Sequence, residues 1–194
     1  MSIANKPLII LIGGAAGTGK TSLAKRLSHE LNIAHRLGSG FMREIAKSFI
    51  SKEQNAYLYN YSFRPHTDIS PFENLYKQSE AIKAPIEACI KRAYDEGTSI
   101  IIEGVNIIPG LINAELATLF VILTVEDYDR HLEMICGKTH FQRQIDEKDF
   151  DRVRMIQEDF KRAAMQNRLP ILDIGAADDA IDSIKELIKR GDNL

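Results

Sequence analysis

The chain has 194 residues, of which 44% are hydrophobic and 27% are charged, and its formal net charge is -2 at neutral pH. This composition is that of an ordinary globular protein and excludes a disordered or fibrous chain, and the length suits a single domain over residues 1–194. The near balance of charge creates no long-range field for nucleic acid, which is therefore not an expected partner.

Residues 7–13 form the first predicted element, a buried strand. The run Pro-Leu-Ile-Ile-Leu-Ile-Gly is apolar and ends in a glycine, which is the pattern of a strand covered on both faces in a parallel sheet. Leu23, Leu27 and Leu31 follow at helical spacing and predict an amphipathic helix over residues 20–32.

The loop between this strand and this helix carries the most specific chemical motif of the chain. Gly14–Thr21, which reads Gly-Ala-Ala-Gly-Thr-Gly-Lys-Thr, matches G-x-x-x-x-G-K-[ST] in the strand–loop–helix context that the motif requires. Its glycines let backbone N–H groups point at phosphate oxygens, and the helix start adds its positive end. Lys20 would reach the β- and γ-phosphates, and the Thr21 hydroxyl would ligate Mg²⁺. The predicted nucleotide-binding residues are Gly14, Ala15, Ala16, Gly17, Thr18, Gly19, Lys20, Thr21 and Ser22.

The next segments are less regular. A weak strand over residues 33–36 and a helix over residues 40–50 are followed by an aromatic and polar stretch, residues 52–71, which reads as a loop because prolines interrupt it. A long helix is predicted over residues 72–96, and Pro85 inside it predicts a kink or a break. Its apolar face is expected to belong to the core.

Three residues of this region are candidates for binding the group that accepts phosphate. Arg43 stands near the start of the predicted helix and could hold an acidic acceptor. Asp68 in the loop, or Glu44 beside the arginine, could act as a general base. A solvated helix start and a capped turn are the alternative interpretation of each residue.

A second buried strand is predicted over residues 98–103 and ends in Glu103. A carboxylate at the carboxyl end of a buried strand beside the first loop is placed to hold Mg²⁺ or to orient water, provided that the two strands are neighbours. The alternative is a glutamate that caps a helix or stabilises a turn. Gly104, the next residue, allows close backbone approach.

The remaining elements continue the alternation of strand and helix. We expect a strand over residues 119–124, a helix over 127–135, a charged helix over 150–167, a short strand over 170–174 and a closing helix over 178–190. Such alternation predicts an α/β fold of three layers, with a doubly wound parallel sheet, right-handed crossovers and helices on both faces.

A polar interruption, approximately residues 136–150, separates the last helices and is a candidate lid. Arg143 lies in it and Arg154 lies in the helix that follows. Either arginine could close over the phosphates and stabilise charge in the transition state. The alternative interpretation is that these arginines belong to a solvated helix face, as arginines on a charged helix more commonly do.

The motifs, taken in order from about Leu8 to Asp173, resemble the 2-phosphoglycerate kinase family and, more widely, the nucleoside-monophosphate-kinase-like P-loop kinases. They are Gly14–Thr21, the Arg43-Glu44 pair, the stretch Glu-Gly-Val-Asn-Ile-Ile-Pro-Gly over residues 103–110, His131 and Val153–Gln157. The resemblance implies transfer of the γ-phosphoryl group of ATP, with Mg²⁺, to a small phosphorylated acid. It also implies a five-stranded parallel sheet in the order 2-3-1-4-5 with a lid.

Two positions depart from the pattern of that family. Gly40 stands where an aspartate is usual before the arginine-bearing helix. Either an acceptor-binding or basic group is missing there, or another carboxylate, Glu44, Asp68 or Glu103, serves instead. His131 is followed by Leu-Glu-Met-Ile-Cys, without the arginine–phenylalanine pair of the lid. Both departures concern the acceptor and not the nucleotide.

The start of the chain and its cysteines bear on the compartment. Residues 1–7 are polar, and the apolar run at residues 8–12 is too short for the core of a signal peptide. No stretch approaches the roughly 20 apolar residues that cross a bilayer. Cys89 and Cys136 are far apart in the sequence and do not have the spacing of metal ligands, which favours two reduced thiols in a cytosolic protein. We expect a cytoplasmic protein, monomeric or homodimeric, without a membrane segment.

The residues leave alternative functions open. One is a different kinase, acting on a nucleotide sugar as zeta-toxin-like proteins do, or on an RNA end. Another is a nucleotide-gated regulatory NTPase that binds a protein partner. The guanine-reading pattern N-K-x-D is absent, because Asn5-Lys6 is followed by Pro-Leu and precedes the first strand.

Overall fold

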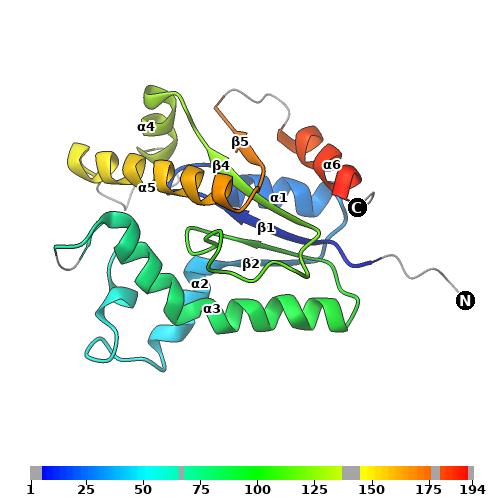
Figure 1. Cartoon of the computed structure of the whole chain (residues 1–194), viewed down its shortest axis with the longest axis horizontal. Coiled ribbons are helices and arrows are strands. Elements are labelled where there is room, and N and C mark those ends of the chain that lie inside the picture. The colour runs from blue at the N-terminus through cyan, green and yellow to red at the C-terminus, as the bar shows by residue number, and fades with distance from the viewer. Residues whose placement is uncertain (1–5, 66–67, 137–144, 176–179, 192–194) are drawn as a thin grey trace, which may run out of the picture.

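A parallel β-sheet forms the centre of the molecule in the computed structural model, which describes residues 6–65, 68–136, 145–175 and 180–191 (Figure 1). Within these ranges five strands pair in the order β2-β3-β1-β4-β5, and all four pairings are parallel. The strands are β1 (Ile9–Gly13), β2 (His35–Gly38), β3 (Ile100–Glu103), β4 (Leu119–Thr124) and β5 (Ile171–Asp173). The predicted fold class and the strand order implied by the resemblance are both confirmed.

Helices cover both faces of this sheet. They are α1 (Lys20–Glu30), α2 (Ser39–Lys47), the 3₁₀ turn η1 (Ala56–Tyr59), α3 (Pro71–Asp95), α4 (Tyr128–Cys136), α5 (Glu147–Gln166) and α6 (Ala180–Gly191). The side chains of β1 alternate between two cores: Ile9 and Leu11 pack with α3 and α5, whereas Ile10 and Ile12 pack with α1 and α6. This alternation is why the strand is apolar at every position. Among the described residues, no helix is long and apolar enough to cross a membrane.

The long helix α3 continues through Pro85 instead of breaking there. Figure 1 shows that it changes direction along its length, as expected where a proline removes one backbone hydrogen bond. The Ser70 side chain caps its start by accepting a hydrogen bond from the Glu73 N–H. The kink is therefore confirmed and the break is not.

Several predicted boundaries differ from the structure; helix α2, for example, ends at Lys47 instead of residue 50, and strand β3 begins at Ile100 instead of residue 98. Strand β2 begins at His35 instead of residue 33, because Asn32 adopts a left-handed conformation (φ 50°) and Ile33 turns into the core. Helix α5 begins at Glu147, since Asp146 accepts the Asp149 N–H and sets an earlier start. The predicted loop over residues 52–71 also contains the 3₁₀ turn η1.

Candidate functional site

The Gly14–Thr21 loop joins β1 to α1 at the carboxyl edge of the sheet. Gly14 has φ of +136°, and a Cβ atom added there would stand 2.4 Å from the Leu123 carbonyl oxygen, so only glycine fits. No side chain caps the start of α1, where Gly19 is the cap residue. The N–H groups of the first turn are therefore available to an anion at the positive end of the helix.

Lys20 is the buried cation of this loop. Its side chain is only 7% exposed; its Nζ donates to the Ala15 carbonyl oxygen and lies 3.2 Å from Thr18 Oγ1. These contacts hold the ammonium group over its own loop. The lysine also lines the adjoining cleft, where it can meet a phosphate.

Glu103 lies directly across from the loop, because β3 is the neighbour of β1 and pairs Glu103 with Ile12. The Thr21 hydroxyl donates to Glu103 Oε1 at 2.9 Å. The condition on which this prediction depended, that the two strands be neighbours, is thus met. Within the described ranges no three His, Cys, Asp or Glu side chains cluster as a metal cage. One hydroxyl and one carboxylate are the sparse oxygen ligands that Mg²⁺ uses beside nucleotide phosphates.

A cleft of about 570 Å³ opens between this loop and the start of α2. Its lining brings together nine predicted residues: Ala16, Gly17, Gly19, Lys20, Thr21, Ser22, Arg43, Glu44 and Glu103. It also includes Ser39 and Met134, which the sequence did not indicate as site residues. Ser39 could have been predicted as a site residue, because it follows directly on a strand of a parallel sheet, where ligands bind. Met134 had none, since it is one apolar residue of the helix α4.

The other predicted catalytic residues are not in this cleft. Asp68 is exposed, lies before α3 and is not part of the lining. Arg143 and most of the candidate lid fall outside the described residues. Arg154 is on α5 and directs its guanidinium to the backbone carbonyls of Val125 and Glu126.

Arg43 and Glu44 form the α2 wall of the cleft. Arg43 donates to Glu44 Oε1 at 3.2 Å, and Lys47 Nζ lies 2.8 Å from the same oxygen. The hydrogen bond from Lys47 and then that from Arg43 lower the pKa of Glu44, against the opposing effect of burial. A carboxylate whose pKa is lowered is a weak proton acceptor, which makes Glu44 a poor general base.

Gly40 occupies the same wall, and nothing in the fold demands a glycine there. It is the second residue of α2, and a Cβ atom at this position would meet no other atom within 4 Å. An aspartate would fit sterically at this position. The departure from the resembling family is therefore a chemical difference and not a packing requirement.

His131 connects the phosphate loop to α5. Its ring is fully buried, with Nε2 2.8 Å from the Ala16 carbonyl oxygen and Nδ1 3.3 Å from Arg154 NH1. A carbonyl only accepts, so Nε2 carries the proton and Nδ1 accepts from Arg154. The same arginine donates to the carbonyls of Val125 and Glu126 at 2.6 and 3.0 Å. Arg154 thus reaches the loop through the histidine.

Burial is the main cause that lowers the pKa of His131, and repulsion from Arg154 lowers it further. The hydrogen bond to Ala16 acts in the opposite direction but is weaker than the effect of burial. The folded protein therefore excludes a proton that the unfolded chain binds below about pH 6.5. Stability should fall as the pH drops below about 6.5, with a slope of up to about 1.4 kcal/mol per pH unit. Urea unfolding between about pH 5 and 7.5 measures the slope, and His131→Gln should remove the part due to this ring. An unchanged slope in the variant would contradict the assignment.

The sheet order, the glycine loop with its lysine and the facing carboxylate define a P-loop protein with the fold of the small kinases. Solved structures agree on the fold: thymidylate kinase from Candida albicans (TM-score 0.60, 14% identity, 97% of this chain and 93% of that one) and shikimate kinase from Acinetobacter baumannii (TM-score 0.56, 15% identity, 97% and 96%). No family model matches the chain.

Sequence relatives point to a more specific group of proteins than the solved structures do. The chain is 29% identical to 2-phosphoglycerate kinase of Methanopyrus kandleri over 94% of its own length and 61% of that protein. It is 36% identical to the protein of the same name from Methanothermobacter thermautotrophicus over 65% of this chain and 45% of the relative. The chain thus spans about half to two thirds of these relatives. The resemblance to the 2-phosphoglycerate kinases that the motifs indicated is confirmed.

Proposed function

We propose that the chain is an ATP-dependent phosphotransferase that acts on a small phosphorylated or acidic acceptor such as 2-phosphoglycerate. The observation that carries this proposal is the composition of one cleft. Its loop wall holds Lys20 and the Thr21–Glu103 pair, and its α2 wall holds Arg43. A nucleotide site and a cationic acceptor site thus face the same space, as direct transfer between two bound molecules requires.

The loop wall would bind the triphosphate. Backbone N–H groups of Gly14–Thr21 and the uncapped start of α1 would bind the phosphates, and Lys20, which lines the cleft, would add a positive charge at the terminal ones. Thr21 and, directly or through water, Glu103 would hold Mg²⁺, which when bound neutralises charge on the phosphate oxygens. Since this chemistry needs mainly positioning and charge stabilisation, these residues suffice for the donor half of the reaction.

The α2 wall would bind the acceptor. Arg43 is mostly buried, and its Nε is a buried donor without a hydrogen-bond partner among the described residues. Leaving such a donor unsatisfied costs about 1–3 kcal/mol, which an anionic group that reaches the guanidinium would offset. The carboxylate or phosphate of a small acid is the kind of group that an arginine recognises.

Other parts of the proposal rest on the sequence. We propose one kinase domain over residues 1–194, with the lid over about residues 136–150 supplying Arg143, and a cytoplasmic location. Asp68 and Glu103 remain as the candidate carboxylates for proton transfer. The geometry adds no observation in favour of a nucleotide-sugar acceptor, an RNA acceptor or a regulatory NTPase.

ADP release tests the proposal. With ATP and Mg²⁺, 2-phosphoglycerate should raise the rate well above the background, and leaving out Mg²⁺ should abolish the increase. The matched panel contains 3-phosphoglycerate, other sugar acids, nucleotide sugars and nucleosides. Stimulation by a different member of the panel would keep the kinase and replace the acceptor. If ATP binds and no acceptor stimulates release, the proposed phosphotransferase is wrong.

A further inference from the structure

A buried polar network joins the loop after β3 to helix α3. Asn106, 1% exposed, lies three residues past Glu103; its Nδ2 donates to Gln78 Oε1 at 3.2 Å and to Ser79 Oγ at 3.0 Å. Its Oδ1 accepts from Ser39 Oγ at 3.0 Å. Gln78 and Ser79 have no exposed surface. The amide of Asn106 therefore connects a residue of the cleft wall, Ser39, to the middle of α3.

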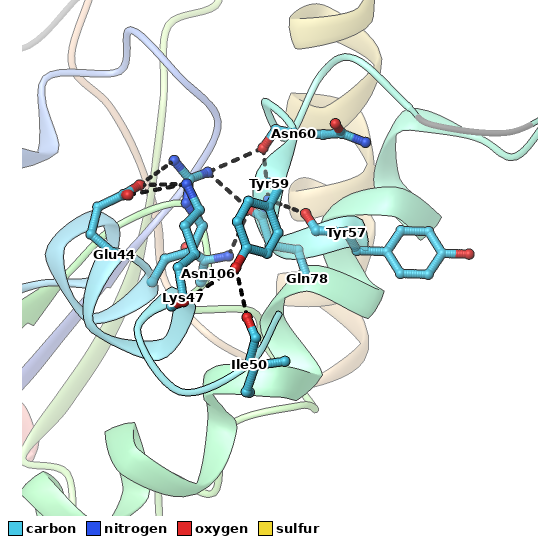
Figure 2. A network of polar contacts seen from close by, with 9 residues as sticks. Glu44, Lys47, Ile50, Tyr57, Tyr59, Asn60, Gln78 and Asn106 are labelled. Atoms are coloured by element: carbon cyan, nitrogen blue, oxygen red, sulfur yellow. Dashed lines mark hydrogen bonds and ion pairs between the residues drawn. The ribbon is translucent and has the colours of Figure 1, made fainter. Parts of the chain in front are cut away.

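Gln78 carries the network onward to the segment around η1. Its Nε2 donates to the carbonyl oxygens of Tyr57 and Asn60, at 2.8 and 3.0 Å (Figure 2). The Asn60 oxygen in turn accepts from Arg43 NH1 at 3.3 Å, and Gln78 Oε1 lies 3.5 Å from the same nitrogen. Arg43 NH1 therefore has two acceptors that involve Gln78: the Gln78 Oε1 atom itself and the Asn60 carbonyl oxygen, to which Gln78 is hydrogen-bonded.

Stability alone gives no reason for this arrangement. Burying an amide is costly, and replacing both partners of a buried hydrogen bond by apolar groups of the same shape is often nearly neutral. The hydrogen bonds of Gln78 and Asn106 do, however, restrict the geometry, since every donor and acceptor of these two amides has a defined partner. Here the two ends of the network are Ser39 and Arg43, and both line the cleft.

We propose that Gln78 and Asn106 are positioning residues that set the direction of the Arg43 guanidinium and thereby the affinity for the acceptor. Asn106 fixes the orientation of the Gln78 amide, and Gln78 fixes the Asn60 carbonyl on which Arg43 rests. This inference depends on the proposed function, in which Arg43 binds the acceptor. It adds two residues that touch neither substrate and predicts that the acceptor, but not ATP, responds to them.

The variants Gln78→Met and Asn106→Leu keep the size of the side chains and remove the hydrogen bonds. Asn74→Leu is the matched control: Asn74 is on the same helix, fully buried, and donates to the carbonyls of Ser62 and Tyr61, neither of which accepts a hydrogen bond from Arg43. With 2-phosphoglycerate and ATP, the first two variants should raise KM for the acceptor about 10- to 100-fold, the loss expected for a misplaced charged hydrogen bond. KM for ATP should not change.

A second readout separates this inference from the proposed function. The Nε–Hε signal of Arg43 in NMR spectra, assigned by its loss in Arg43→Lys, reports the position of the guanidinium without any substrate. It should shift or broaden in Gln78→Met and in Asn106→Leu and stay in place in Asn74→Leu. If wild-type protein fails to phosphorylate 2-phosphoglycerate, the proposed acceptor is wrong, and this signal still tests the positioning.

Two results would overturn the inference. One is an unchanged Arg43 signal in Gln78→Met. The other is an equal rise of the acceptor KM in Asn74→Leu, since that would mean that any buried polar loss on α3 has the same effect.

Discussion

Replacing Lys20 with alanine is expected to lower phosphoryl transfer by at least about 10²–10³-fold, the loss typical when one preorganised donor to a developing charge is removed. The physical reason is that Lys20 carries the buried positive charge of the phosphate loop and lines the cleft. Its ammonium group contacts Ala15 and Thr18 of the same loop, and loss of such local contacts should leave the fold intact. The measurement is ADP release under saturating ATP and acceptor.

The control for this prediction is Lys25→Ala. Lys25 is on the same helix α1 but is exposed and absent from the cleft lining, so its loss should leave the rate unchanged. Circular dichroism and the urea midpoint should show that both variants are folded. A Lys20→Ala protein with the full wild-type rate would show that the loop does not bind the reacting phosphates, and the kinase assignment would fail.

Gly104→Ala should have the largest effect on stability, about 2–5 kcal/mol, because it combines backbone strain with overpacking. Gly104 has φ of +147°, and a Cβ atom there would stand 1.8 Å from Ser39 Oγ and 2.7 Å from Ser39 Cβ. Relief of this clash requires the start of α2 to move away from β3, which widens the cleft. Urea unfolding measures the loss of stability, and the acceptor KM measures the movement of the wall.

Gly97→Ala is the control for a glycine with positive φ that has no close neighbour. Gly97 also has a positive φ, +64°, but a Cβ atom there would meet nothing within 4 Å. Its substitution should therefore cost only about 1–2 kcal/mol. The double variant Ser39→Gly/Gly104→Ala should recover the steric part of the loss. Should Gly104→Ala cost no more than Gly97→Ala, the close approach of α2 to β3 would not matter for stability.

Much of the proposed donor half of the site could be predicted from the sequence because its residues are close together along the chain. Gly14–Thr21 lies between a buried strand and an amphipathic helix, and both patterns are local. Glu103 could be predicted as well, since carboxyl ends of neighbouring parallel strands meet at one edge of the sheet. The structure adds the distance, 2.9 Å between Thr21 and Glu103.

The proposed acceptor half of the site was less accessible to prediction. Helix α3 was expected to present an apolar core face, yet Gln78 and Asn74 are buried on it. Each polar residue has its partners in a distant segment, as Gln78 has in Asn106, and nothing in the local pattern distinguishes it from a solvated residue. Arg154 gives the same lesson, because a charged helix face was visible in the sequence but its contact with His131 was not.

The sequence by itself determined the fold class, the nucleotide loop and the resemblance to the 2-phosphoglycerate kinases. Periodicity, glycine spacing and strand ends are local properties, and burial of apolar faces turns them into one sheet. Only the tertiary structure decided that Arg43 faces the cleft while Asp68 does not, and that Gln78 and Asn106 meet. The direction of a polar side chain depends on which donors and acceptors the packed helices bring within about 3 Å, and that information is absent from any single segment.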